Sequence, residues 1–521
     1  MRIGIDLDNT IINYNLAFFA ALKSEKKFKS LKFKDKQDLK KKIIKKENGL
    51  INWQKLQGKV YGKYIFHAQL MVGFERFLSL CKIRNHEVYI VSHKTTFGHY
   101  DNEKIPLREV AIQFLKKKKL FDINKYNLKY KNIHFAESKS EKVKIINSLN
   151  LQYFIDDLFI ILSDNNLETN INKILIGHYG KKINNSKIIC KSNWEEISNH
   201  IYKHINFNDL KFYTNLLNIK DLVKYSKINK GINSKVYKII SSNNKKYILK
   251  IYPNNINNNN FTNRGFNEYS ALKYLNLKNF KSIPYPISRE KYLDICAYSW
   301  IEGKKNKSFK TQNVINLIIF IKKLKKISAS TSFKKFNFAS ESSNNILELL
   351  SVNKNRIYKL KKIFISRDFS KLIKKIEDLN IKISKNITCA IKNKKIEPIL
   401  RKKNLILSPS DISLSNIISD GKKDYYIDFE YFGWDDPCKL ISDLLWHPKN
   451  KISNDNSIEL YQNLLAIFSD DKEIYYRFNL SFNLYGVIWS LIMLNIFTKT
   501  NPQTIRQIMS KSSKNNIFVK Q

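Results

Sequence analysis

The chain has 521 residues, of which 43% are hydrophobic and 13% aromatic. That length predicts two or three domains, and that apolar content excludes a disordered chain. The formal net charge of +48 is compatible with attraction to polyanions, but the lysines are scattered from end to end, as the lysine-, asparagine- and isoleucine-rich product of an AT-rich coding sequence would show.

The apolar and cysteine patterns predict a cytoplasmic protein without a membrane span. The most apolar stretch, 484–497, is shorter than the roughly 20 residues that a span needs, and we interpret it as a buried helix. Five well-separated cysteines are typical of reduced thiols. No secretory signal precedes the first expected strand. The oligomeric state leaves no signal in the sequence.

Residues 1–203 alternate between strand-like and helix-like stretches. Strands are expected at 2–7, 87–91, 132–137, 152–156 and 171–180. Short apolar strands separated by helices predict a parallel sheet covered on both faces. We therefore expect a Rossmann-like α/β domain, with a helical insert at about 13–75 above the strand ends.

The pattern changes after a predicted linker at 204–221. Residues 225–252 contain three successive strand-like runs, which predict an antiparallel meander. Helical patterns dominate from 265 onward, broken by a hairpin-like segment at 405–432. The second domain, 222–521, is thus expected to be α+β, with a small sheet followed by a mostly helical body.

Pairs of carboxylates follow two of the expected strands in the first domain. Asp6 and Asp8 lie at the end of the first strand, and Asp156 and Asp157 lie at the end of the fourth. Helix capping or a surface loop would explain either pair alone. Because desolvating neighbouring carboxylates costs free energy, both pairs at strand ends favour a ligand site, which open α/β sheets form at that edge.

Two further polar residues complete the set of functional groups that phosphoryl transfer needs. Ser92 follows a strand and Lys142 opens a helix, although Lys139 lies close enough to compete with it. One carboxylate can attack phosphorus while a second moves a proton, and a hydroxyl and an ammonium can hold the phosphoryl oxygens. The remaining carboxylates suit Mg²⁺.

The stretches "DLDNT", "VYIVS" and "FIDD", together with Lys142, resemble the four motifs of the haloacid dehalogenase-like phosphohydrolase superfamily. The resemblance covers about residues 1–200. It implies that Asp6 is the nucleophile and Asp8 the acid/base. It also implies that Mg²⁺ contacts Asp6, Asp156 and the carbonyl of Asp8, with Asp157 beside them.

The second domain carries a different set of candidate phosphate-binding residues. Gly231 and Ser234 lie in a strand–turn–strand whose backbone N–H groups can meet phosphates. Lys250 on the next strand could pair with the α- and β-phosphates of ATP, and Glu268 on a helix could orient that lysine.

Asp411, Asn416 and Asp428 form a kinase-type catalytic layout. An asparagine stands five residues after the first aspartate, and the second aspartate follows a short strand. Asp411 would accept the proton of the substrate hydroxyl. Asn416 and Asp428 would hold Mg²⁺ on the nucleotide.

This half resembles the aminoglycoside phosphotransferase and choline kinase-like family over about residues 222–500. The resemblance implies a protein-kinase-like fold with a small N-lobe sheet and a mostly helical C-lobe, and an adenine-receiving hinge at "WIEG", with Ile301 as a contact. Two features depart from the family. The glycine loop has only Gly231, and Pro409 stands where a histidine is usual.

These features predict a bifunctional phosphoryl-transfer enzyme that uses Mg²⁺ and ATP. A phosphatase-type domain would act through an aspartyl-phosphate, and a kinase would phosphorylate a small hydroxylated metabolite, such as a sugar or amino alcohol of surface-polysaccharide synthesis. An alternative is a catalytically silent kinase-like module that binds or regulates. Nucleic-acid end processing is less favoured, because the nearest P-loop-like string, 58–64, has the wrong spacing.

Overall fold

The computed structural model describes residues 1–24, 31, 33, 36–100, 102–177, 187–202, 205–228, 234–253, 264–291, 293–363 and 367–499, with side chains to 494 in the last helix. The chain divides into two compact units. Unit 1 contains 1–245, 249–263 and 289–295. Unit 2 contains 246–248, 264–288 and 296–521.

Unit 1 is built on a six-stranded sheet in the order β5-β4-β1-β6-β7-β8, and neighbouring strands all run parallel. The strands are β1 (Arg2–Ile5), β4 (Glu87–His93), β5 (Leu128–Ala136), β6 (Tyr153–Asp156), β7 (Asn172–Ile176) and β8 (Ile188–Lys191). The predicted parallel sheet is therefore confirmed. The inner strands β1 and β6 are short and apolar because both faces are covered, whereas the edge strand β5 has exposed residues at 129–131.

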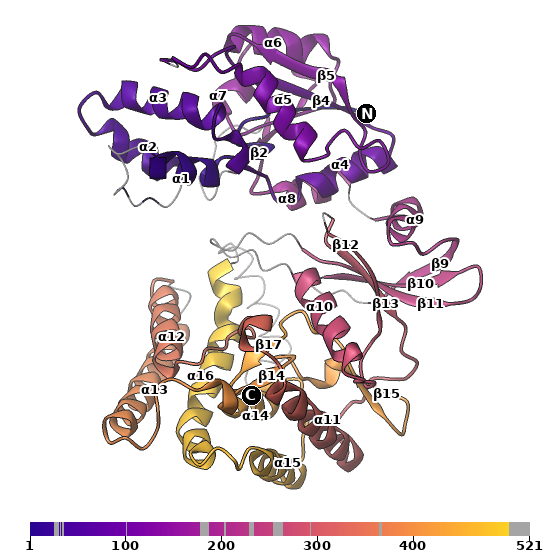
Figure 1. Ribbon diagram of the computed structural model, residues 1–521, viewed down its shortest axis with the longest axis vertical. Helices are drawn as coiled ribbons and strands as arrows, with labels where there is room; N and C mark the ends of the chain where they lie inside the picture. Colours follow the sequence, from indigo (N-terminus) through magenta and orange to yellow (C-terminus); the bar gives the residue numbers. More distant parts are fainter. Residues whose placement is uncertain are drawn as a thin grey trace. The chain divides into compact units, whose positions relative to one another are not determined.

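Helices cover the two faces of this sheet (Figure 1). On one face, Phe74 and Phe77 of α4 (Phe74–Ile83) pack against Trp194 of α8 (Trp194–Ile201), with ring centroids 5.0 and 4.9 Å apart. On the other, α6 (Lys139–Ser148) and α7 (Phe159–Leu162) enclose a core that includes Phe154. Gly4 faces this core, where a Cβ would lie 2.3 Å from Leu151. The central strand thus has no room for a side chain there.

The segment between β1 and β4 carries mainly helices (Figure 1). It holds β2 (Ile12–Asn13), α1 (Asn15–Ser24), α2 (Lys36–Ile44), α3 (Gly49–Tyr61), the 3₁₀ turn η2 (Ile65–His67) and β3 (Gln69–Leu70). Strands β2 and β3 pair antiparallel and close the base of the segment. Helix α5 (Leu107–Lys117) follows β4, and α9 (Phe207–Leu216) lies within the predicted linker.

A five-stranded sheet has the order β12-β13-β11-β10-β9. It consists of β9 (Leu222–Lys227), β10 (Lys235–Ser241), β11 (Lys246–Ile251), β12 (Pro286–Glu290) and β13 (Ile295–Ser299). The first three strands are those of the predicted meander. The expectation that helices dominate from 265 onward is wrong at β12 and β13, since these five-residue strands are too short to show a clear period.

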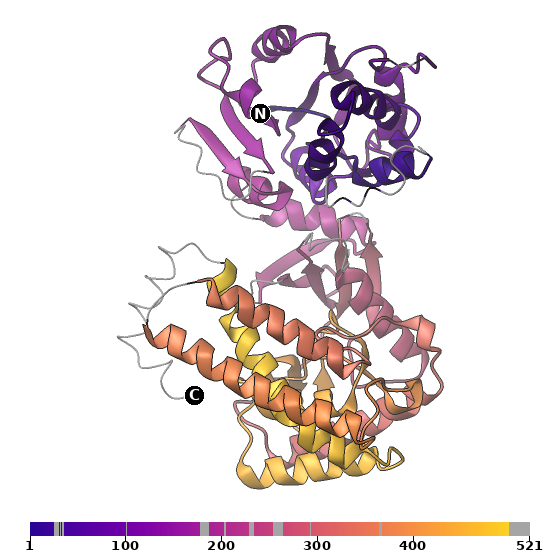
Figure 2. The same ribbon diagram turned by 90° about the vertical axis from the view of Figure 1, so that its left-hand side faces the viewer.

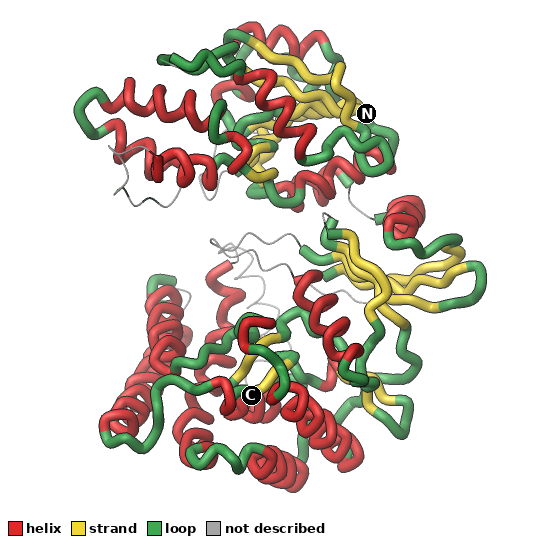
Figure 3. The backbone as a smooth tube through the Cα atoms, viewed as in Figure 1, coloured by secondary structure: helices red, strands yellow, loops and turns green. Residues whose placement is uncertain are grey.

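Unit 2 is mostly helical (Figure 3). Its helices are α10 (Arg264–Leu277), α11 (Thr311–Ala329), α12 (Ile346–Lys361), α13 (Arg367–Lys392), α14 (Pro437–Trp446), α15 (Asn454–Ile467) and α16 (Ile474–Lys499), with 3₁₀ turns η3 (Phe333–Lys335), η4 (Lys402–Asn404) and η5 (Leu414–Asn416). Helices α12 and α13 pack together and against α16 (Figure 2).

The segment at 405–432 holds one hairpin and a further strand, which pairs with a strand just after the segment. Strand β14 (Ile406–Ser408) pairs with β17 (Gly433–Asp435), and β15 (Ile417–Ser419) pairs with β16 (Asp424–Tyr426). The inner pair is the predicted hairpin. The outer pair closes the loop that carries Asp411.

The apolar stretch at 484–497 lies in α16, and its residues Leu484, Val487 and Leu491 are buried. Among the residues that the structure describes, no helix combines the length and the apolar character needed to cross a membrane.

Candidate active sites

The first cluster of predicted residues lies at the carboxyl edge of the parallel sheet in unit 1. Asp6 follows β1, and its backbone N–H donates to the carbonyl of Ile155 at 2.9 Å, so the β1–β6 ladder continues to the residue before Asp156. Ser92 lies near the end of β4, on the other side of β1. Because the three strands run in one direction, their ends bring Asp6, Ser92 and Asp156 to the same edge.

Lys142 joins two of these carboxylates. Its Nζ donates to Asp6 Oδ1 at 2.6 Å and to Asp156 Oδ2 at 2.7 Å, and all three side chains are buried. Burial alone would lower the pKa of Lys142, but the two carboxylates outweigh it and raise the pKa, so the ammonium stays charged. The competing Lys139, on the same helix, is exposed.

Asp6, Asp156 and Asp157 form a group that fits a divalent cation. One carboxylate oxygen from each lies within 4.8 Å of the others. Burial raises the pKa of Asp6, and burial together with neighbouring Asp156 raises the pKa of Asp157 to about 7. Mg²⁺ prefers hard oxygen donors, and its charge would offset the repulsion between these carboxylates. Lys142 supplies part of that compensation within the protein.

Two hydroxyl groups of this unit have no hydrogen-bond partner among the described residues. They are Ser92 Oγ and Thr10 Oγ1, and both are buried. An unpaired buried hydroxyl costs free energy, and such atoms are often found where a ligand or water binds. Ser92 was predicted to hold a phosphoryl oxygen, and its free hydroxyl fits that role. Thr10 is the last residue of the "DLDNT" stretch.

Asp8 has two partners that sequence reasoning missed. Its Oδ1 accepts from the Tyr14 hydroxyl at 2.6 Å, and its Oδ2 forms an ion pair with Lys94 at 2.8 Å. Lys94 stands two residues after Ser92, a spacing that places both on one side of an extended chain. This alternation along the strand was the sequence signal that could have identified Lys94 as a site residue. Use of the Asp8 carbonyl as a metal ligand stays a prediction.

The helical segment after β1 adds residues beside this cluster. Lys36 of α2 donates to the Tyr61 hydroxyl at 2.8 Å and to Asn9 Oδ1 at 3.2 Å. The Lys94 ammonium lies 4.6 Å from the centroid of the Tyr61 ring. Asn9 has φ of 62°, a left-handed conformation that asparagine tolerates well. The predicted insert therefore contacts the loop that carries Asp8.

The second cluster lies between β14 and β17 of unit 2. Asn416 donates from Nδ2 to the backbone carbonyl of Asp411 at 3.2 Å. Across the β15–β16 hairpin, Ile427 N–H donates to the Asn416 carbonyl at 2.9 Å, and Asp428 is the next residue. The loop closure and the hairpin thus connect the three predicted residues, Asp411, Asn416 and Asp428.

Asp411 has a partner from a distant part of the chain. His447, at the end of α14, places Nε2 3.3 Å from Asp411 Oδ1. Burial raises the pKa of Asp411, but the interaction with His447 and the charge of Lys449 outweigh burial, so the pKa lies below its ordinary value of 3.8. Asp411 is therefore an ionised carboxylate at neutral pH. Sequence reasoning did not single out His447.

Asp428 belongs to a second acidic group. Carboxylate oxygens of Asp428, Glu268 and Glu430 lie within 4.8 Å of one another, and Glu430 also pairs with Arg264 at 3.2 Å. Oxygen donors of this kind suit Mg²⁺. Glu430 stands two residues after Asp428 and was not predicted. Orientation of Lys250 by Glu268 stays a prediction.

The predicted nucleotide-binding residues are described in part. Gly231 lies outside the described residues. Ser234 precedes β10 and is half-buried, and Lys250 lies buried on β11. Their roles toward phosphates stay predictions.

The predicted hinge is fixed to unit 2 by backbone pairing. Lys304 and Ser419 exchange two hydrogen bonds of 2.8 Å. Gly303, between Ile301 and this bridge, has φ of 145°, and a Cβ there would lie 2.5 Å from the Ser419 carbonyl. Glycine is therefore required for the close approach. A contact of Ile301 with adenine stays a prediction.

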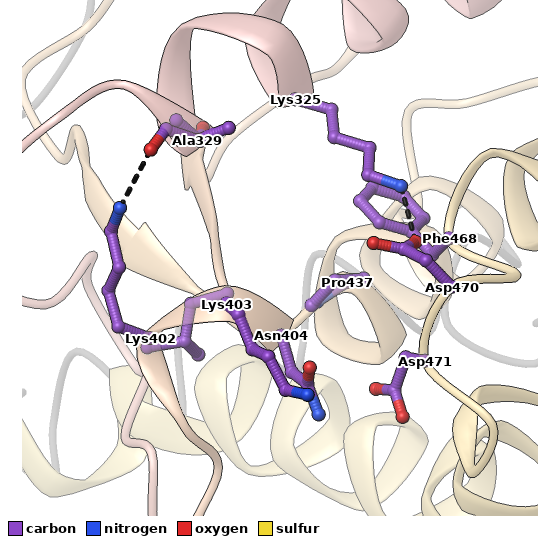
Figure 4. A pocket seen from close by; sticks show the side chains of 11 residues that line it. Lys325, Ala329, Lys402, Lys403, Asn404, Pro437, Phe468, Asp470 and Asp471 are labelled. Carbon is purple, nitrogen blue, oxygen red and sulfur yellow. Dashed lines mark hydrogen bonds and ion pairs between the residues drawn. The ribbon is translucent and has the colours of Figure 1, made fainter.

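A further cavity of unit 2, of about 230 Å³, lies between α11 and η4 (Figure 4). Lys325 forms an ion pair with Asp470 there, and Lys402 donates to the carbonyl of Ala329 at 3.0 Å. None of the predicted site residues lines it. We assign no site to this cavity, because Lys325 and Lys402 already have hydrogen-bond partners within the protein.

No family model matches the sequence, and no curated protein matches it. Solved structures do match. Spectinomycin phosphotransferase in complex with ADP and spectinomycin is 18% identical, with a TM-score of 0.40, over 58% of this chain and 92% of that chain. A choline/ethanolamine kinase family protein from Mesorhizobium loti is 14% identical, with a TM-score of 0.37, over 54% of this chain and 82% of that chain.

Amicoumacin kinase hAmiN is 13% identical, with a TM-score of 0.40, over 61% of this chain and 96% of that chain. The solved structures that this chain resembles are thus phosphotransferases and kinases. At identities below 25% and TM-scores below 0.5, these likenesses do not establish the activity of this chain.

Proposed function

We propose that this chain transfers phosphoryl groups at two magnesium-dependent sites, a phosphatase-type site in unit 1 and an ATP-dependent kinase site in unit 2. The observation that carries the first is the Lys142 bridge between Asp6 and Asp156 at the edge of a parallel sheet. The substrates would be small phosphorylated and hydroxylated metabolites, handled in the cytoplasm.

At the phosphatase-type site, Asp6 would attack the phosphorus of a phosphomonoester. The bond from phosphorus to the ester oxygen breaks, and Asp8 gives its proton to the leaving oxygen. Asp8 then takes a proton from water, which attacks the aspartyl-phosphate and releases inorganic phosphate. Tyr14 and Lys94 contact Asp8 as a carboxylate, which is the form that takes the proton from water in the second step. Mg²⁺ held by Asp6, Asp156 and Asp157 would stabilise the phosphoryl charge.

The first test measures hydrolysis of para-nitrophenyl phosphate by the full chain, with Mg²⁺ and with EDTA. We expect Mg²⁺-dependent release of phosphate that Asp6→Asn lowers by about 10³-fold or more, because the nucleophile is lost. ADP formation from ATP is the control and should not change. Hydrolysis that survives in Asp6→Asn would refute this site.

At the kinase site, Asp411 would take the proton of an acceptor hydroxyl while the hydroxyl oxygen attacks the γ-phosphorus of ATP and ADP leaves. The supporting observation is that Asp411 is an ionised carboxylate tied to Asn416, which the β15–β16 hairpin places beside Asp428. Asn416 and Asp428 would hold Mg²⁺, which neutralises the nucleotide phosphates when bound.

The second test measures ADP formation from Mg²⁺-ATP, with water or added sugars and amino alcohols as acceptors. We expect Asp411→Asn to lower kcat by about 10²–10⁴-fold, because the proton acceptor is lost. Hydrolysis of para-nitrophenyl phosphate should not change. Binding of ATP by the native chain without ADP formation on any acceptor would favour the alternative, a silent kinase-like module.

A further inference from the structure

The two residues before Asp411 offer its carboxylate no side-chain donor. Pro409 has none, and the Ser410 hydroxyl donates to the carbonyl of Ser340 at 3.1 Å. Asn416 donates to the backbone carbonyl of Asp411 at 3.2 Å, and its side chain also interacts with the Asp411 carboxylate. His447 Nε2 lies 3.3 Å from Asp411 Oδ1. That buried oxygen has no partner with full hydrogen-bond geometry among the described residues.

The environment of His447 fixes which ring nitrogen carries the proton. Nδ1 lies 3.1 Å from the backbone N–H of Lys449, which donates to it, so Nδ1 is an acceptor. A neutral imidazole then carries its hydrogen on Nε2. Nε2 is the atom that lies 3.3 Å from Asp411 Oδ1. The ring therefore presents an N–H group to the carboxylate.

Packing against Trp489 restricts the orientation of the His447 ring. Trp489 of α16 contacts it edge-to-face, with ring centroids 4.7 Å apart. The Trp489 indole N–H donates to Asp443 Oδ1 at 2.7 Å, and Asp443 Oδ2 pairs with Lys439 at 2.6 Å. This series of contacts lies on α14 and α16 and limits rotation of the imidazole.

A second residue attaches the same segment to the catalytic loop. Asn450 Oδ1 accepts from the N–H of Leu414 at 2.9 Å, and its Nδ2 donates to the carbonyl of Ile412 at 3.2 Å. The N–H of Asn450 in turn donates to the His447 carbonyl at 2.9 Å. The backbone that follows Asp411 and the ring that faces its side chain therefore belong to one rigid arrangement.

We propose that His447 is the positioning residue of Asp411. As a neutral donor from Nε2, it holds Oδ1 of the carboxylate, so that the other oxygen can face the acceptor hydroxyl and take its proton. A separation of 3.3 Å is long for a hydrogen bond, and such contacts commonly shorten when substrates bind. This inference rests on the proposed kinase function of unit 2.

The test compares His447→Phe with His447→Gln in the full chain, with ADP formation from Mg²⁺-ATP as the assay. Phenylalanine keeps a ring against Trp489 but removes the donor, whereas glutamine restores an N–H group near the position of Nε2. We expect His447→Phe to lower kcat about 10–100-fold with the KM for ATP unchanged, and His447→Gln to recover most of the loss.

A double variant tests whether the effect runs through Asp411. The kcat of Asp411→Asn with His447→Phe should equal that of Asp411→Asn alone. Without the Asp411 carboxylate, His447 has no catalytic group to position. Thermal unfolding and binding of Mg²⁺-ADP confirm that each variant is folded.

Three results would overturn the inference. His447→Phe could keep native kcat, His447→Gln could be as slow as His447→Phe while both are folded, or the double variant could be slower by the full product of the two losses. In each case native ADP formation would leave the kinase function standing. A folded native chain that binds Mg²⁺-ATP but forms no ADP would overturn both.

Discussion

Lys142 and Lys139 lie three residues apart on α6, and the fold buries one and exposes the other. The buried ammonium contacts two carboxylates, each of which would otherwise carry an unpaired charge away from water. Removing one partner of a buried ion pair strongly lowers the free energy of unfolding, because it leaves an uncompensated charge in the protein interior.

We expect Lys142→Met to lower the local stability of unit 1 by about 3–5 kcal/mol at pH 8, because Asp6 and Asp156 lose their shared cation. Hydrogen exchange of the β1 and β6 amides measures this for unit 1 alone. Lys139→Met is the matched control, with an expected change within about 0.5 kcal/mol. Equal protection in the two variants would contradict the role assigned to Lys142.

At the scale of elements, parallel strands explain why distant residues meet. The β1 register aligns Ile5 with Ile90 and Ile155, so the residues after these positions share one edge. Helix α4 supports this sheet from one face and begins with a half-buried acid, Glu75, whose Oε1 accepts from the Tyr126 hydroxyl at 3.1 Å.

Glu75 should make stability depend on pH. Burial raises its pKa from 4.5 to about 7, so between these values the folded chain holds a proton that the unfolded chain has released. Stability from this group therefore falls as pH rises from about 4.5 to 7 and then levels off. Glu75→Gln should remove that dependence and stabilise the chain at pH 8 by on the order of 1 kcal/mol, since the site is partly solvated.

Thermal unfolding at pH 5 and pH 8 measures the effect of Glu75→Gln. Glu109→Gln, at an exposed position in the first turn of α5, is the control and should shift the melting temperature equally at both values. A Glu75→Gln chain with the native dependence on pH would show that Glu75 is ionised in the fold at pH 5.

At the scale of the whole molecule, the key carboxylates of the two candidate sites belong to different compact units. The cation that contacts Asp6 lies in unit 1, and the histidine that contacts Asp411 lies in unit 2. The net charge of +48 describes the composition and does not locate either site. Several lysines close to the chemistry, including Lys94, Lys142 and Lys439, are in buried ion pairs and are not displayed to a polyanion.

The order of strands and helices in unit 1 and the acidic residues at the strand ends could be predicted from the sequence, because hydrophobic period and residue type are local properties. The roles of the site residues and the domain boundaries remain predictions. Strands β12 and β13 were missed, since their positions in the sheet depend on neighbours and not on their own five residues.

The residue types that suit phosphoryl chemistry, and their order along the chain, can be read directly from the amino-acid sequence. Their partners depend on tertiary packing: Lys94 and Tyr14 for Asp8, Glu430 for Asp428, and His447 for Asp411. His447 stands 36 residues after Asp411. A contact across that separation is set by helix packing and strand register, which leave no periodic pattern around either residue.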